Sequence, residues 1–189
     1  MNDSRPITVL LTQAKSGNPE ASRKLWESVY DEIRVLSQRA LDREFGQPTL
    51  QATELAHEAY LKLVGSSVLA AENRSHLLAT VAKAIRQLLV DRARARKADK
   101  RGGKQVRVLL DDILDESIAN PTDLLDLNDA LEQLALIDSR HAKLVELRYF
   151  GGMTLEEAAD ELDLSRRTLA SDWALAKAWL RRYLDRGRS

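Results

Sequence analysis

The sequence predicts an all-α fold of two small helical domains joined by an acidic linker. Helix-breaking residues are few, with 8 Gly and 4 Pro among 189 residues, and Leu, Ala, Glu, Arg and Lys dominate the composition. Apolar residues recur at helical spacing along most of the chain. Because 44% of the residues are hydrophobic, the chain can bury a core in one ordinary domain or in two small ones.

Composition also excludes several classes of protein. The absence of cysteine excludes disulfides, thiolate metal sites and cysteine nucleophiles. The N-terminal stretch MNDSRPITVL lacks the basic-then-apolar order of a signal peptide, and no apolar run approaches about 18 residues. We therefore expect a soluble, cytoplasmic protein that does not insert into a membrane.

The sequence contains no complete catalytic or metal-binding motif. The 3 histidines lie far apart, and neither a Gly-rich phosphate loop nor a G-x-S-x-G motif occurs. DDILD at 111–115 matches the spelling of Mg²⁺-diphosphate sites, but such enzymes need a large helical cavity and a second metal motif. HEAYL at 57–61 begins like a zinc-protease motif, but Leu61 stands where the second histidine belongs. We expect no enzymatic activity, cofactor, metal or small-molecule substrate.

Two helices are predicted at the N-terminus. The first runs from about Pro6 to Lys15 and stops at Gly17. The second covers 19–45, with Asn18 as its N-cap and Pro19 at its first helical position. Its apolar face consists of Leu25, Val29, Ile33, Leu36 and Ala40.

Two further helices follow before residue 103. One begins at Thr49 or Thr53 and carries Leu55, Ala59 and Leu63 on one stripe. The next is capped by Asn73 or Ser75 and continues to Gly102-Gly103. Its apolar face consists of Leu78, Val81, Ile85, Leu88 and Leu89.

Charge is segregated along the chain although 29 basic residues balance 29 acidic ones. Residues 91–107 contain eight basic and two acidic side chains, whereas 111–132 contain eight acidic and no basic ones. Residues 103–126 show no sustained period, and they predict a linker with one short helical turn at most. The separation of positive and negative charge along the chain carries more information about binding partners than the zero net charge does.

The stretch GGMTLEEAADELDLSRRTLASDWALAKAWL (151–180) predicts a helix-turn-helix. Thr154 and Glu157 form a capping box, so a short helix begins at Leu155. A turn at 163–165 follows, in which Asp163 occupies the place where glycine often supplies a positive φ. Ser165 caps a longer helix whose buried stripe is Leu169, Trp173, Ala176, Leu180 and Leu184. In this motif the start of the second helix faces the DNA major groove, although a helical hairpin without a DNA role also fits the pattern.

Four collinear segments carry a resemblance to a known family. Residues 136–180 resemble the C-terminal DNA-binding domain of bacterial sigma factors. The segments 30–41, 49–64 and 73–103 are similar to the N-terminal core domain of the same proteins. Their order, their spacing and the short acidic linker resemble the extracytoplasmic-function (ECF) class, which implies domains at 1–102 and 127–189 with the linker at 103–126.

The resemblance implies a subunit that binds core RNA polymerase, directs it to promoter DNA and helps to open the duplex. It places the polymerase contacts on the helix 51–64, at Glu54, His57, Glu58 and Lys62. It places downstream-element contacts at Asn73, Arg74, Ser75 and His76, and phosphate contacts at Lys83, Arg86, Arg92, Arg94, Arg96 and Lys97. The acidic linker would thread through positively lined channels of the polymerase, or serve only as a solvated spacer. Whether an anti-sigma protein is a further partner stays open.

The upstream-element contacts implied by the resemblance are Arg166, Arg167, Thr168, Ser171, Asp172 and Leu175. Relatives usually carry basic residues at the positions of Ala170, Ser171 and Ala174, so we expect weak DNA binding for the class. Relatives also have aromatic residues around the loop before Asn73, where this chain offers only His76. A stand-alone regulator that binds DNA as a dimer is the main alternative, and a helical interaction protein without DNA binding is another.

Overall fold

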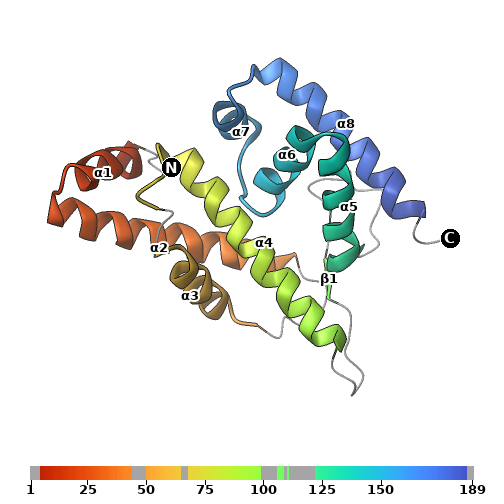
Figure 1. The fold of residues 1–189 in the computed structure, drawn as a ribbon, viewed down its shortest axis with the longest axis horizontal. Helices are drawn as coiled ribbons and strands as arrows, with labels where there is room; N and C mark the ends of the chain where they lie inside the picture. The colour runs from red at the N-terminus through yellow and green to blue at the C-terminus, as the bar shows by residue number, and fades with distance from the viewer. Residues whose placement is uncertain are drawn as a thin grey trace.

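A computed structural model describes residues 5–43, 50–64, 68–98, 106–108, 110 and 122–186. Within these ranges the chain forms eight helices and one two-stranded ladder, which confirms the all-α class (Figure 1). The helices are α1 (Arg5–Lys15), α2 (Pro19–Asp42), α3 (Ala52–Leu63), α4 (Arg74–Ala98), α5 (Leu124–Ile137), α6 (Ser139–Tyr149), α7 (Leu155–Leu162) and α8 (Arg166–Arg186).

Helix α2 is the base of the N-terminal helices. The Asn18 side chain accepts hydrogen bonds from the backbone N–H groups of Glu20 and Ala21, both at 3.0 Å, as predicted for an N-cap. Helices α1 and α3 pack on α2, and α4 crosses it (Figure 1). The predicted apolar face of α2 is buried in full, at Leu25, Val29, Ile33, Leu36 and Ala40.

The starts of α3 and α4 differ in how they are capped. Helix α3 begins at Ala52, one residue before the predicted Thr53, and the Gln51 side chain makes no capping hydrogen bond; the alternative start, Thr49, lies outside the described residues. Helix α4 begins after Asn73, whose Oδ1 accepts from the His76 N–H at 2.9 Å. Helix α4 is the longest, with 25 residues, and it contacts both the N-terminal helices and α5, α6 and α7.

The segment predicted as an irregular linker contains a short antiparallel ladder. Strand β1 (Arg107–Val108) pairs with β2 (Thr122–Asp123), and the Leu124 N–H donates to the Val106 carbonyl at 2.8 Å. Val106, Val108 and Leu110 are buried, because the alternation of this stretch aims its apolar side chains at the core. Within the described part of the segment, 107–108 and 122–123 are therefore extended, whereas 124–126 already belong to α5; 103–105, 109 and 111–121 lie outside the described residues.

Helices α5 and α6 meet at a single residue. Helix α5 begins at Leu124 rather than near Leu127, because the Asp123 side chain caps it through the Leu125 N–H at 2.8 Å. Asp138 is both the C-cap of α5 and the N-cap of α6. Hydrogen bonds from the backbone of His141, at 3.1 Å, and of Arg140, at 3.0 Å, hold the pKa of Asp138 below its usual range.

The helix-turn-helix forms as predicted at α7 and α8. The Thr154 hydroxyl accepts from the Glu157 N–H at 3.1 Å, and the Glu157 carboxylate accepts from the Thr154 N–H at 2.9 Å, which completes the capping box. Asp163 takes the left-handed conformation, with φ 52° and ψ 48°, and the Leu164 N–H bonds to the Ala159 carbonyl at 3.0 Å.

Helix α8 packs on α5, α6 and α7 along its predicted stripe. The buried residues are Leu169, Trp173, Ala176, Leu180 and Leu184. The Arg148 guanidinium lies 5.2 Å from the Trp173 ring and donates to the Met153 carbonyl at 2.7 Å, which joins α6 to α8 and to the connection that precedes α7. In the part of the chain that the structure describes, no helix combines the length and apolarity needed to cross a bilayer.

The left-handed turn residue yields a stability prediction. Asp163→Gly removes the steric cost of φ 52° at a non-glycine residue, so we expect the free energy of unfolding to rise by about 0.5–1 kcal/mol. Asp163→Val should lower it, because a β-branched side chain fits this conformation poorly. Urea unfolding followed by circular dichroism measures both variants. A lower unfolding free energy for the glycine variant would contradict the turn described here.

Candidate nucleic-acid interface

The first turns of α8 present an open polar surface. Arg166, Arg167, Thr168, Ser171 and Leu175 are all exposed, so the structure brings five of the six predicted upstream contacts onto the outer side of one helix. The Ser165 hydroxyl caps the helix through the Thr168 N–H at 3.1 Å. The backbone N–H groups of this first turn attract anions, and Arg166 and Arg167 add formal charge at the same end.

Arg166 forms an ion pair within the motif. Its Nη1 lies 2.6 Å from Oε1 of Glu156, and the two side chains are 75% and 62% exposed. An ion pair this exposed stabilises the fold little, because water and salt screen it. A DNA phosphate can therefore replace Glu156 as the partner of Arg166 at small cost.

Asp172 does not lie where a DNA contact would. Its carboxylate is buried against α6, with Oδ2 at 2.9 Å from Nε of Arg140 and Oδ1 at 3.4 Å from Nε2 of His141. Position 172 follows Leu169 by three residues and precedes Trp173, so the rotation of α8 that buries those side chains also turns Asp172 inward. Asp172 thus fixes α8 on α6, and the prediction that it contacts DNA does not fit this position.

The residues at the start of α4 lie together, but three of the four, Asn73, Arg74 and His76, already have partners. Asn73 is the helix cap, and Nδ1 of His76 accepts from the Glu72 N–H at 3.4 Å. Ser75 and His76 are half-buried, whereas Arg74 is buried. The nearby apolar side chains at 71, 77 and 78 are buried too, so they offer no flat surface for a base.

Arg74 joins three helices. Its Nη2 lies 2.8 Å from Oε1 of Glu32 on α2, and its Nη1 lies 2.8 Å from Oε1 of Glu157 on α7. Burial raises the pKa of the Glu157 carboxyl, but hydrogen bonds from Thr154 and Arg74 outweigh burial and hold that pKa below its usual range. The capping-box glutamate of the helix-turn-helix is therefore also an anchor for the N-terminal helices.

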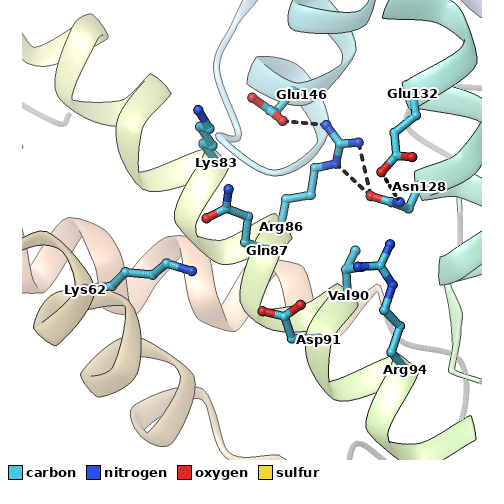
Figure 2. A pocket seen from close by; sticks show the side chains of 10 residues that line it. All are labelled: Lys62, Lys83, Arg86, Gln87, Val90, Asp91, Arg94, Asn128, Glu132 and Glu146. Carbon is cyan, nitrogen blue, oxygen red and sulfur yellow. Dashed lines mark hydrogen bonds and ion pairs between the residues drawn. The ribbon is translucent and has the colours of Figure 1, made fainter. Parts of the chain in front are cut away.

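Arg86 makes a second connection between the two groups of helices (Figure 2). Its Nη1 lies 2.7 Å from Oε2 of Glu146 on α6, and its Nε and Nη2 donate to Oδ1 of Asn128 on α5 at 3.3 and 3.1 Å. Asn128 in turn donates to Glu132 at 2.8 Å. These groups line a polar cavity of about 450 Å³, into whose rim Lys62, Lys83 and Arg94 also project.

The α6–α7 connection approaches α4 closely. A Cβ on Gly151 would lie 3.2 Å from Cβ of Ala82 and 2.6 Å from the Leu147 carbonyl oxygen, so no side chain fits there. Arg43, at the end of α2, donates to the Tyr149 carbonyl at 2.9 Å, and its guanidinium lies 5.0 Å from the Tyr149 ring. These contacts complete the junction between the N-terminal and C-terminal helices.

The remaining basic side chains of α4 differ in their surroundings. Lys83, Arg94 and Lys97 are exposed, and Arg96 is half-buried. Arg92 lies 2.6 Å from Oε1 of Glu58 and 3.4 Å from Oε1 of Glu54, so it bridges α4 to α3. The predicted phosphate contacts therefore occupy several sides of α4 rather than one continuous strip.

Helix α3 buries its stripe and exposes three of the four predicted polymerase contacts, whereas Glu58 is half-buried. Leu55, Ala59 and Leu63 are buried as predicted, while the charged and polar side chains of Glu54, His57, Glu58 and Lys62 point outward or are half-covered. Leu61 lies on this outer face and is 60% exposed. Sequence reasoning missed it, although an apolar residue outside the buried stripe is a readable signal.

Other residues of the junction left no sequence signal. Glu32, Asn128, Glu146 and Glu157 hold arginines that lie between 42 and 83 residues away along the chain. No local spacing links such partners. Among the described residues, no three His, Asp or Glu side chains come together as a metal site requires.

The chain matches one family of known proteins over nearly its whole length. Among curated proteins none matches the sequence. One solved structure, described as CnrH in complex with the cytosolic domain of CnrY, aligns with 95% of this chain and 97% of its own, at 20% sequence identity and a TM-score of 0.45. A family model described as ECF sigma factor matches residues 4–186. The chain therefore belongs to the ECF sigma factor family.

Proposed function

We propose that this sigma factor divides its contacts among three helices. The outer face of α3 binds core RNA polymerase, the first turns of α8 read the upstream promoter element, and α4 contacts the downstream element and its phosphates. The observation that carries the proposal is the open start of α8, where five predicted contacts are exposed on a helix whose buried stripe is fully packed.

The composition of α8 favours a reader that works together with polymerase. Its outer side carries Arg166 and Arg167, but the next turn offers Ala170, Ser171 and Ala174. Phosphate contacts supply most nonspecific DNA affinity, so a surface with two arginines binds free DNA weakly. A sigma factor tolerates weak DNA binding by α8, because polymerase supplies much of the affinity for promoter DNA and α8 contributes selectivity.

The two groups of helices act as separate binding units in this proposal. Residues 1–102 carry the polymerase and downstream-element contacts, and 127–189 carry the upstream contacts. The segment 103–126 runs between them within the polymerase. The protein itself has no enzymatic activity and no cofactor: it works in the cytoplasm, and the chemical step of transcription belongs to the polymerase.

A binding experiment tests the assignment of partners. We expect the protein to co-elute with core RNA polymerase and to bind promoter DNA weakly on its own. Sequencing of transcripts induced by overexpression identifies the promoters to use. Tight binding of a dimer to DNA without polymerase would contradict the proposal and favour a stand-alone regulator.

Arginine substitutions test the reading face. Arg166→Ala and Arg167→Ala should each lower promoter-specific transcription in a reconstituted reaction by roughly fivefold or more, which corresponds to a contact worth about 1 kcal/mol. Affinity for polymerase should not change. Arg182→Ala is the matched control, because Arg182 is exposed on the C-terminal half of the same helix. Full activity of both N-terminal variants would show that the reading face lies elsewhere.

Leu61 tests the polymerase surface. Leu61→Ala should weaken binding to core RNA polymerase by roughly 5- to 30-fold, since the loss of a buried leucine contact at an interface costs about 1–2 kcal/mol. Thermal stability should stay the same, because Leu61 is 60% exposed in the free protein. Val35→Ala on α2, where Val35 is 43% exposed, is the control. Equal affinities for the two variants would remove α3 from the interface.

A further inference from the structure

The segment that leads into α4, residues 68–73, is anchored by two buried side chains. Val68 and Ala71 are each only 1% exposed, and the Ala71 N–H donates to the Val68 carbonyl at 3.1 Å, which closes a turn. The other side chains of the segment are exposed, at Leu69, Ala70, Glu72 and Asn73. The backbone conformation of 68–73 therefore decides how these exposed side chains are presented to a partner.

One peptide group of this segment is held from both sides. The Ala71 carbonyl accepts a hydrogen bond from Nζ of Lys15, the last residue of α1, at 2.8 Å. The N–H of the same peptide group, which belongs to Glu72, donates to Nδ1 of His76 on α4 at 3.4 Å. Because a peptide group is planar, the two bonds together set its orientation. Loss of one bond frees the torsions on either side of the group and thus the path of the chain into Asn73.

The Lys15 side chain reaches away from its own helix. A lysine in the last turn of a helix commonly interacts with the carbonyl groups of that turn. In α1 these carbonyls already accept from the backbone N–H groups of residues 16, 17 and 18, at 3.2, 3.0 and 3.1 Å. Lys15 also forms no ion pair in the part of the chain that the structure describes. Its ammonium is therefore available to a carbonyl that lies 56 residues further along the chain.

Helix α1 makes a second contact, with the first residue of α4. The Thr8 hydroxyl accepts from the Arg74 N–H at 3.4 Å, and this N–H is one of those that a helix N-terminus leaves without an intrahelical partner. Thr8 and Lys15 are seven residues apart, so they lie on the same side of α1, about two turns from each other. Helix α1 thus contacts the chain at Ala71 and again directly after Asn73.

We propose that Lys15 is a positioning residue for recognition of the downstream element: through the Ala71 carbonyl it holds 68–73 in the conformation that selects bases. The inference rests on the proposed role of the start of α4. It adds a residue of α1, a helix to which no contact with DNA or polymerase is assigned. Lys15 acts through the segment 68–73 and does not itself touch DNA.

Two variants separate the hydrogen bond of Lys15 from the bulk of its side chain. Lys15→Met keeps an apolar stem and removes the ammonium, whereas Lys15→Arg keeps N–H donors at the end of the side chain. The matched control is Lys24→Met on α2, which removes the same charge from an exposed ion pair with Glu20. Because Lys15 is exposed, we expect all three variants to fold.

Hydrogen exchange tests the contact in the free protein. In Lys15→Met, we expect the amides of 69–76 to exchange roughly fivefold faster than in the wild type, the size expected for the loss of one hydrogen bond. Lys15→Arg and Lys24→Met should exchange like the wild type. Unchanged exchange of these amides in Lys15→Met overturns the inference.

Transcription with core RNA polymerase tests the selectivity. Promoters identified by transcript sequencing carry each base in turn at every position of the downstream element, with the upstream element unchanged. The quantity measured is the ratio of transcription from the preferred base to transcription from the other bases. Lys15→Met should lower this ratio by roughly threefold or more, whereas Lys15→Arg and Lys24→Met should keep it.

The ratio distinguishes positioning from a general structural role. A loss of folded protein lowers transcription from all promoters equally, so lower transcription with an unchanged ratio in Lys15→Met overturns the inference. Wild-type protein that directs transcription without any base preference in the downstream element overturns the proposed role of the start of α4. A wild-type preference that Lys15→Met retains in full leaves that role standing and removes only the positioning by Lys15.

Discussion

The burial of α4 between two groups of helices is the constraint on which the rest of the arrangement depends. This helix of 25 residues contacts α2 and α3 on one side and α5, α6 and α7 on the other. At about 1.5 Å per residue it extends along the whole junction. Its arginines therefore meet different neighbours: Arg74 near one end, Arg86 near the middle and Arg92 beyond it, each facing a different set of helices.

This sharing explains how a chain with a strongly basic segment offers only part of that segment to a partner. Arg86 is neutralised by the C-terminal helices, and Arg92 by the acidic residues of α3. The basic side chains of α4 that remain exposed are Lys83, Arg94 and Lys97. Counting basic residues along a sequence overstates the positive surface whenever the fold pairs them internally.

Local features of this fold were predictable because their causes are local. The Asn18 cap, the capping box at Thr154 and the buried stripe of α8 depend on residues within a few turns of one another. The Val106–Val108 alternation could have predicted β1, but the acidic composition of the segment hid it. Asp172 could have been recognised as inward-facing from its spacing to Leu169, whereas the partners of Arg74 and Arg86 could not, because tertiary packing alone brings them together.

The single-residue connection between α5 and α6, at Asp138, affects the positions of the two side chains that bind Arg86. One residue ends α5 and begins α6, with no connecting loop, so its backbone angles of φ −150° and ψ 102° set the angle between the two helices. Asn128 projects from one helix of this bend and Glu146 from the other. The angle between α5 and α6 thus fixes the spacing between their oxygens. An inserted residue at 138 would change that angle and break both helix caps at once. Because α5 and α6 share this one residue, no connecting loop is present at this corner to absorb a change in chain length.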